Sequence, residues 1–427
     1  MDYKNKFYIG MVSTVPPRKC GIAKFNWDFF NSIKNDYRIH DKGFYSIVKE
    51  PLDYDLKTKK LVEKEINQDE TESWRSSLDD MIEKTIIRRK EGIDSGFFFQ
   101  HEYGIFGRDH DSDDNIVYML EKLKDYNIPT ITITHTLERG MSDFKNNVMK
   151  GILEYTDKVV CLTPSAVGRF REMYNAPRGK LIHIQHGVPR VEITETKNKL
   201  KKYYGFVDEH GKPRKVISNV GLLSDGKGIQ YALEGFASFL NKEKSNNLIY
   251  CVAGETHPEV KRKEGESYRE SSLKLAHDLG LKAVNYKPSE NSNVDLSKVN
   301  VVFYDKYLDD MEYLKFMKMS DLGLVTNQGK DQISSGQIAY WVGMGRPVIA
   351  TESPYAKDME DEGIGLLVKF GDSKDISDTL EFYFNLPERE QNELENLALG
   401  KGATMTWPIV GQSYINLMES LIEYKKS

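Results

Sequence analysis

The chain has 427 residues, of which 39% are hydrophobic and 29% are charged, and its formal net charge is -5. This composition is typical of a globular protein, and the length predicts two domains of about 200 residues each. The negative net charge argues against a general nucleic-acid binder. No apolar segment is long enough to span a bilayer, although contact with a membrane surface stays open.

The first expected strand, Phe7–Val12, is followed by a loop that contains Pro16 and Pro17 and by a helix that begins at Gly21. A strand, loop and helix in this order can place a polar ligand above a sheet, and Gly21 is the candidate for close approach. The residues before the strand lack the features of a signal peptide, so a cytoplasmic location is expected.

The chain contains three cysteines, in keeping with a reducing compartment. Cys161 and Cys251 lie in apolar strands and are expected to pack as small hydrophobic residues. Cys20 lies in the loop before Gly21, and nothing near it in sequence marks it as a nucleophile.

Apolar segments of strand length alternate with amphipathic helices through the first half of the chain. This alternation is typical of a parallel sheet that is covered on both faces. The strands are expected at Gly96–Gln100, Thr130–Thr134, Lys158–Leu162 and Lys180–Ile184, and helices at Asn115–Asp125 and Pro164–Tyr174.

After His186–Pro189 the pattern gives way to a Lys-rich region up to Arg214, which we interpret as a linker and a helix. The alternation then restarts, and we predict an α/β protein with two Rossmann-like domains, residues 1–190 and 191–408, with a ligand cleft between them. The strands of the second domain are expected at Lys215–Gly221, Leu248–Ala253, Val299–Tyr304, Leu322–Val325 and Pro347–Ala350.

The segment Gln332–Ala350 combines a Ser/Gly-rich turn, a short helix and a buried strand. Ser334 or Ser335 is expected to cap the helix, and Gly345 to end it. Gly336 would let a ligand approach the first backbone N–H groups of the helix. An anion is favoured at this positive end, and a phosphate suits it.

Six segments, taken together and in order, resemble the retaining glycosyltransferases of family four: Pro16–Ala23, Gln100–Gly107, Ile184–Pro189, Val220–Gly228, Gly254–Pro258 and Ser334–Val348. The resemblance implies the GT-B fold, in which two Rossmann-like domains face each other across a cleft. It also implies that the segment from Trp407, with a helix over about residues 409–427, crosses back onto the first domain. A nucleotide sugar, UDP- or GDP-hexose, would be the donor, a glycan or glycoside the acceptor, and no cofactor is expected.

Glycosyl transfer requires stabilisation of a departing diphosphate, which fixed cations and backbone N–H groups provide. Lys227, in a Gly-Lys-Gly turn, is the candidate cation, because the family uses the lysine of this motif on the donor phosphates; taken alone, it could be a solvated turn lysine. The arginine that many members carry nearby is missing, since Leu222 and Leu223 follow Gly221. Arg18 or Lys19 could substitute, or both could be solvated.

Three polar side chains follow two strand ends of the first domain. His135 ends the strand Thr130–Thr134, and the family places a histidine of this motif beside the reacting sugar; the residue alone would also fit a structural role. His101 and Glu102 end another strand and are interpreted as acceptor-side residues. His186 and His257 are interpreted as structural turn residues.

The chain departs from the family at two positions that usually carry glutamates, one for the donor sugar and one for the nucleotide ribose. Alignment places Gln332 and Tyr340 there, and neither supplies a carboxylate. Gln332 is nevertheless the candidate for the sugar contact and Tyr340 for the ribose side.

No Asp-x-Asp cluster stands at a strand end, so a metal-independent mechanism is expected, and the acidic segment Asp109–Asp114 is interpreted as a solvated loop. Two alternatives stay open. One is a non-catalytic nucleotide-sugar sensor that lost the ribose-binding carboxylate. The other is a phosphorolytic enzyme in which free phosphate occupies the diphosphate site.

Overall fold

The computed structural model describes residues 6–107, 114–190, 192–242, 247–291 and 293–426. The chain divides into two compact units. Unit 1 comprises Met1–Gly187, Asp331–Ser334 and Thr406–Ser427, and unit 2 comprises Val188–Lys330 and Ser335–Met405. The division therefore comes slightly earlier than the expected residue 190. The segment Asp331–Ser334, which the sequence placed in the second domain, belongs to unit 1.

The sheet of unit 1 contains seven described strands, paired in parallel in the order β3-β2-β1-β4-β5-β6-β7. Its central strands β1, β4 and β5 are buried along almost their whole length, as is typical of a parallel sheet that is covered on both faces. The bounds are β1 Phe7–Ser13, β2 Ile39–Val48, β3 Val62–Asn67, β4 Asp94–His101, β5 Thr130–Thr134, β6 Lys158–Cys161 and β7 Leu181–His183.

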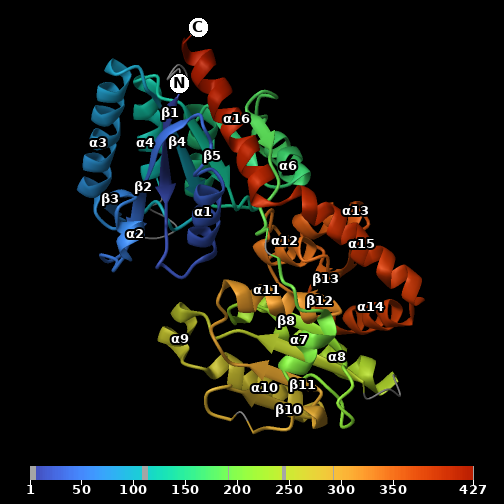
Figure 1. Ribbon diagram of the computed structural model, residues 1–427. Helices are drawn as coiled ribbons and strands as arrows, with labels where there is room; N and C mark the ends of the chain where they lie inside the picture. Colours follow the sequence, from blue (N-terminus) through green and yellow to red (C-terminus); the bar gives the residue numbers. More distant parts are fainter. Residues whose placement is uncertain (1–5, 108–113, 191, 243–246, 292, 427) are drawn as a thin grey trace. The chain divides into compact units, whose positions relative to one another are not determined.

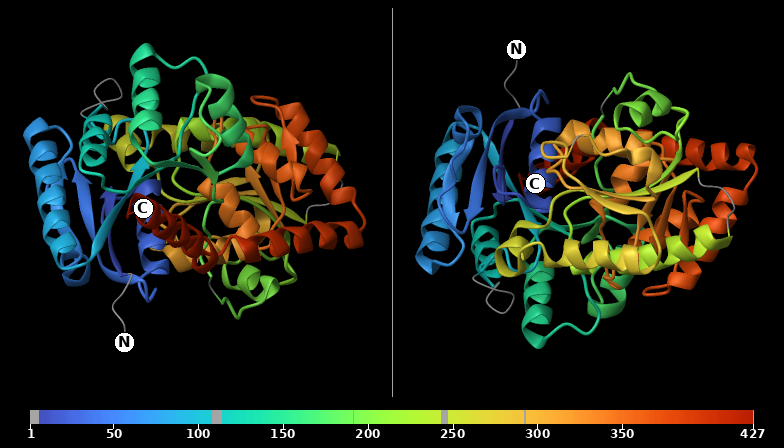
Figure 2. Two further views of the ribbon diagram at one scale, coloured as in Figure 1. Left: turned by 90° about the horizontal axis from the view of Figure 1, so that it is seen from above. Right: turned by 90° about the horizontal axis from the view of Figure 1, so that it is seen from below.

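Helices cover both faces of this sheet, and β1 shows why. Its side chains alternate between two cores, with Tyr8 and Val12 in one and Ile9 and Met11 in the other. The first core is completed by α3, α4, α5 and α6, and the second by α1 and α16 (Figures 1 and 2). The bounds are α1 Gly21–Ser32, α2 Leu56–Lys59, α3 Thr71–Lys90, α4 Asn115–Asp125, α5 Asp143–Tyr155, α6 Pro164–Tyr174 and α16 Trp407–Lys426.

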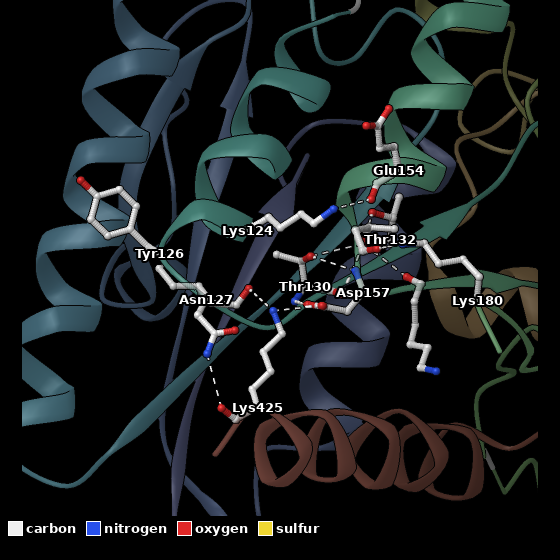
Figure 3. A network of polar contacts seen from close by, with 12 residues as sticks. Lys124, Tyr126, Asn127, Thr130, Thr132, Glu154, Asp157, Lys180 and Lys425 are labelled. Carbon is white, nitrogen blue, oxygen red and sulfur yellow. Dashed lines mark hydrogen bonds and ion pairs between the residues drawn. The ribbon is translucent and has the colours of Figure 1, made fainter. Parts of the chain in front are cut away.

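The C-terminal helix α16 packs against the strands of unit 1. Its Met418 lies over Gly96 of β4, where an added Cβ atom would come within 2.2 Å of the methionine sulfur, so only glycine permits this approach. Near the chain end, Lys425 Nζ lies 2.9 Å from Asp157 Oδ1, and the other carboxylate oxygen of Asp157 accepts a 2.8 Å hydrogen bond from the Thr130 backbone N–H (Figure 3). The helix is thereby tied to the start of β5.

The sheet of unit 2 also contains seven described strands, paired in parallel in the order β10-β11-β9-β8-β12-β13-β14. Side chains of β9 alternate between two cores in the same way, with Cys251 in one and Tyr250 in the other. The bounds are β8 Lys215–Val220, β9 Leu248–Ala253, β10 Ala283–Tyr286, β11 Val301–Tyr304, β12 Leu322–Val325, β13 Val348–Thr351 and β14 Gly365–Val368.

Helices α7, α11, α12, α13 and α15 contribute to one core of unit 2, and α8, α10 and α14 to the other. No described helix of the chain is both long and apolar enough to cross a membrane. The bounds are α7 Lys197–Tyr203, α8 Ile229–Lys242, α9 Pro258–Glu264, α10 Ser267–Asp278, α11 Asp310–Met319, α12 Gly336–Gly343, α13 Pro354–Asp361, α14 Ser373–Asn385 and α15 Glu388–Thr404, with 3-10 turns η1 Asp225–Lys227 and η2 Leu296–Lys298.

Candidate functional site

Each sheet has a point at which the strand order reverses. In unit 1 this point lies between β1 and β4, and in unit 2 between β8 and β12. The loops at the carboxyl ends of such neighbouring strands diverge, and α/β proteins commonly bind ligands there. Lys227 lies after β8, and the segment after β12 leads to the N-terminus of α12. In unit 1, the loop after β1 leads to α1, which begins at Gly21, and Glu102 follows β4.

In unit 2, the turn with Lys227 is joined to the loop after β12 by two hydrogen bonds. The Thr326 hydroxyl donates to the Lys227 carbonyl at 2.9 Å, and the Gln328 backbone N–H donates to the Gly226 carbonyl at 2.9 Å. Gly228 then enters α8 with a φ of 62°. The backbone of Lys227, in the segment after β8, is thus held against the loop that follows β12.

The side chain of Lys227 points to α12. Its ammonium donates to Gln337 Oε1 at 3.4 Å, and the Gln337 amide donates to Asn219 Oδ1 at 3.0 Å and to the Val220 carbonyl at 3.1 Å. Burial lowers the pKa of Lys227, and no described carboxylate counters this shift by pairing with the ammonium. A partly buried cation without an acidic partner gains from an anionic ligand.

Gln337 belongs to the first turn of α12, so its contact with Lys227 places the N-terminus of this helix next to the lysine. Ser335 is the N-cap, and its hydroxyl accepts from the Ile338 backbone N–H at 3.3 Å. Gly336 opens the helix, and Gly345 follows its end with a φ of 64°. Of the two serines considered for the cap, Ser335 is therefore the one used. Backbone N–H groups and a lysine here suit a phosphate.

Tyr340 lies farther along α12 and is half-buried. Its ring packs edge-on against Tyr313, with ring centroids 5.8 Å apart. Because the ring packs in this way, its position is fixed by the helix and by α11. The ribose-side role of Tyr340 stays a prediction.

The loop after β9 extends the pairing of β8 and β9 beyond the strands. The Leu223 backbone N–H donates to the Glu255 carbonyl at 2.9 Å, and the His257 backbone N–H donates to the Leu223 carbonyl at 2.8 Å. His257 is the N-cap of α9, with its ring accepting from the Glu259 backbone N–H at 3.2 Å. This loop therefore supports the turn that carries Lys227, and the His257 side chain has a capping role.

In unit 1, His135 lies directly after β5 and is 6% exposed. Its Nε2 atom lies 2.9 Å from Gln100 Oε1, and its ring packs edge-on against Phe25. Burial, together with the charges of His186 and His101, lowers the pKa of His135 to about 3, so the ring is neutral at neutral pH. Among the described residues, the only hydrogen-bond partner of the ring is Gln100, at Nε2.

Glu102 follows β4 and contacts the loop after β5. Its carboxylate accepts from the Thr136 hydroxyl at 2.6 Å and from the Tyr103 backbone N–H at 3.1 Å. Burial raises the pKa of Glu102 to about 7. His101 is fully buried, and its ring packs against Tyr103. A ligand contact by His101 would require this packing to open, and its acceptor-side role stays a prediction.

The raised pKa of Glu102 predicts a pH-dependent stability. The unfolded chain releases this proton near the ordinary value of 4.5, but the folded chain releases it only near 7. Stability therefore falls as pH rises between these values, and the loss persists above 7. We expect Glu102→Gln to reduce this fall by on the order of 2 to 3 kcal/mol. Urea unfolding of both proteins at pH 4.5 and 7.5 measures it, and parallel pH profiles would contradict the assignment.

The loop after β1 leads to the N-terminus of α1. Cys20 is the N-cap, and its sulfur accepts from the Ala23 backbone N–H at 3.3 Å. An added Cβ atom on Gly21 would meet nothing within 4 Å, so open space adjoins this glycine. Arg18 donates to the Ile47 carbonyl at 3.4 Å and to Gln68 Oε1 at 3.3 Å, contacts that place its guanidinium against β2 and the end of β3.

The two serines before α12 have separate roles. Ser334 belongs to unit 1, where its hydroxyl donates to the His135 carbonyl at 2.8 Å. Gln332, two residues earlier, is half-buried in the same segment, and no described residue forms a hydrogen bond with its amide. In unit 1, Gln332 therefore lies two residues from a serine that bonds to the His135 backbone, and the sugar-contact role of Gln332 stays a prediction.

Several residues that contact the candidate site residues within each unit were not singled out from the sequence: Gln100, Thr136, Arg169, Asn219 and Gln337. Gln337 carries a local signal, because it follows a serine N-cap and Gly336 and so lies in the first turn of α12. The others are recognised only through contacts with distant parts of the chain.

Within the described residues, no group of three or more His, Cys, Asp or Glu side chains could hold a metal ion. The acidic segment Asp109–Asp114, interpreted as a solvated loop, lies outside the described residues except for Asp114, which precedes α4.

No protein-family model matches the sequence, and no curated protein matches it. Solved structures match over nearly the whole chain. A glycosyltransferase from Rickettsia africae aligns with a TM-score of 0.69 at 14% identity, covering 98% of this chain and 99% of that one. HepE from Anabaena, in complex with UDP, aligns with a TM-score of 0.69 at 12% identity, covering 97% and 100%. The two-unit α/β fold is that of the GT-B glycosyltransferases.

A third match extends this group. A UDP-forming α,α-trehalose-phosphate synthase from Burkholderia xenovorans, in complex with glucose-6-phosphate, aligns with a TM-score of 0.62 at 10% identity, covering 96% of this chain and 100% of that one. At identities of 10 to 14%, these matches show a shared GT-B fold and nothing further.

Proposed function

We propose that the protein is a retaining, metal-independent glycosyltransferase that moves a hexose from a UDP- or GDP-sugar to a carbohydrate acceptor, similar to the enzymes of family four. The observation that carries this proposal is Lys227, a partly buried cation without a described acidic partner, linked through Gln337 to the N-terminus of α12. Its loop lies at the point where the strand order of unit 2 reverses. Solved structures of this fold include HepE with UDP and HepE with UDP-glucose.

In the proposed reaction, the bond between the anomeric carbon and the diphosphate oxygen breaks, and negative charge grows on the leaving diphosphate. Lys227 and the first backbone N–H groups of α12 stabilise that charge without rearranging. The acceptor hydroxyl forms the new bond to the anomeric carbon and gives its proton to the leaving phosphate. Attack on the face from which the diphosphate departs retains the configuration.

Unit 1 supplies the groups that orient the sugars in this proposal. The neutral ring of His135 accepts or donates one hydrogen bond through Nδ1, while Gln100 holds Nε2. Gln332 offers its amide to the transferred hexose. Glu102, with a pKa near 7, binds a hydroxyl of the acceptor in either protonation state.

A nucleotide-sugar sensor is the second candidate. Gln332 and Tyr340 favour it, because neither supplies the carboxylate that the family uses to bind the donor. A sensor and a transferase both bind the nucleotide, and only the transferase releases nucleoside diphosphate from it.

Binding of a nucleotide is the first test. We expect UDP or GDP to raise the melting temperature, because a ligand at 100 times its Kd stabilises the native state by about 2.7 kcal/mol. Thermal unfolding with each common nucleoside diphosphate measures this, and inorganic phosphate serves as the control for simple anion binding. If no nucleotide shifts the melt more than phosphate does, both nucleotide-binding proposals fail.

A further inference from the structure

The segment Asp331–Ser334 is a short excursion of the chain. The residues on either side of it belong to unit 2, but these four residues pack in unit 1. Ile333 is fully buried in the core that α3 to α6 form on one face of the sheet. Removal of an isoleucine side chain from water stabilises the packed state. The packing of Ile333 therefore holds the segment against unit 1.

Two polar contacts hold the segment on either side of Gln332 and Ile333. Ser334 donates to the His135 carbonyl at 2.8 Å. At the other end, Nη1 of Arg169, on α6, lies 2.8 Å from Asp331 Oδ1 and 3.3 Å from the Asp331 carbonyl. The Arg169 side chain is 11% exposed and that of Asp331 is 29% exposed. A charge-assisted hydrogen bond that is shielded from water in this way is stronger than an exposed one.

The first contact ends on the loop that follows β5, and the second is linked to the same loop through Arg169. The same Nη1 atom of Arg169 donates to the Leu137 carbonyl at 2.9 Å, two residues after His135. Because one residue spans at most about 3.6 Å of extended chain, the Cα atom of Gln332 lies within about 7 Å of that of Ser334. Gln332 is thus held near His135 by contacts at both ends of its segment.

We propose that Arg169 is a positioning residue, which presents the Gln332 amide to the hexose of the donor by holding Asp331 against the loop of His135. The inference rests on the proposed function, because it takes Gln332 as the sugar contact. Arg169 itself touches no substrate. Loss of Arg169 leaves Ile333 buried but releases one end of the segment, so the position of Gln332 becomes less precise. Misplacement of a positioning group by about 1 Å can cost 100-fold in rate.

The structure offers a matched control in the same region. Arg139, in the loop after β5, pairs with Glu172 of α6 at 2.8 Å, but both side chains are 58% exposed. Exposed pairs of this kind contribute little to stability. Arg139→Ala therefore removes an arginine between the same two elements without affecting the segment.

The test compares binding of UDP-glucose with binding of UDP by calorimetry, with GDP-mannose and GDP as the second pair of probes. We expect Arg169→Ala to raise the Kd of the nucleotide hexose about tenfold and to leave the Kd of the nucleoside diphosphate unchanged. Gln332→Ala should do the same, and the double variant should show no further loss, because both changes remove one contact. Arg139→Ala should match the unmodified protein.

Four results would overturn the inference. Equal weakening of both ligands in Arg169→Ala would indicate a general structural role, and additive losses in the double variant would show that Arg169 does not act through Gln332. Behaviour of Arg169→Ala like that of Arg139→Ala would remove Arg169 from ligand binding.

If Arg169→Ala fails to fold, Asp331→Ala breaks the same contact from the more exposed side, and a normal preference for the nucleotide hexose in that variant would likewise contradict the inference. Failure of the unmodified protein to bind any of the four probes would instead contradict the proposed function.

Discussion

Lys227→Ala is expected to lower kcat/KM by about 100-fold or more, because loss of one fixed group that stabilises charge in the transition state typically costs this much. Gln337 holds the ammonium beside the first turn of α12, and no described carboxylate pairs with it. A bound diphosphate would therefore not have to displace an acidic side chain. The fold should survive, because the backbone contacts of Thr326 and Gln328 with this turn do not involve the lysine side chain. Steady-state kinetics with a nucleotide sugar and far-ultraviolet circular dichroism measure both effects.

Lys274→Ala is the matched control for the lost charge. Lys274 also belongs to unit 2, but its side chain is 77% exposed and pairs only with Asp278 on its own helix among the described residues. We expect this variant to keep normal turnover. If Lys227→Ala retains near-normal kcat/KM as well, Lys227 has no part in the reaction.

Gly254→Ala is expected to destabilise unit 2 by roughly 3 kcal/mol and to abolish nucleotide binding. Gly254 has a φ of 142°, which side chains rarely permit, and an added Cβ atom would lie 2.1 Å from the carbonyl oxygen of Gly221. Gly221 cannot move away freely, since its backbone N–H donates to the Ala253 carbonyl at 2.8 Å. Displacement of Gly221 would move the turn of Lys227, which follows it in the chain.

Gly400→Ala is the control for this substitution. Gly400 lies in α15 of unit 2, and an added Cβ atom there would meet nothing within 4 Å. Alanine in a helix interior is favoured over glycine by up to about 1 kcal/mol, so this variant should be neutral or more stable. Urea unfolding of both variants provides the comparison. Equal midpoints for Gly254→Ala and Gly400→Ala would show that the close approach of the two loops is unimportant.

Several strands that are buried throughout could be predicted from the sequence. The bounds of β5, β9 and β12 agree with the expected segments. β9 and β12 are apolar along their length, and β5 alternates isoleucine with threonine, a β-branched residue that strands favour. The strands β2 and β3 were missed. β2 carries the polar residues His40, Asp41 and Lys42 near its start. β3 is an edge strand, and its residues Val62–Asn67 are mostly polar and partly exposed.

The short strands β10 and β14 were missed for a related reason. Each has four residues, and each stands at one edge of the sheet in unit 2, where less apolar surface is buried. Both strands are only partly buried, which the local sequence does not reveal. An edge position alone does not prevent prediction, because β7, a short edge strand of unit 1, was expected within Lys180–Ile184.

A similar contrast holds for the candidate site residues of each unit. Lys227 and Gly336 could be selected because each lies in a short local pattern, a turn followed by the start of a helix. Such a pattern is typical of anion binding. The partners of these residues come from pairings over long distances, as with Lys227 and Gln337, which are 110 positions apart. The docking of Asp331–Ser334 in unit 1 required the full structure, because its only local signal, one isoleucine between polar residues, is common in loops.

Incubation of the purified protein with nucleotide hexoses and a mixture of mono- and disaccharide acceptors, followed by proton NMR, tests the central claim most directly. We predict release of UDP or GDP and a first product with the anomeric configuration of the donor. Binding of the nucleotide sugar without release of nucleoside diphosphate would contradict the transferase proposal and favour a sensor. An inverted product would contradict the retaining mechanism, and formation of a hexose phosphate from a glycan and free phosphate would replace the account with phosphorolysis.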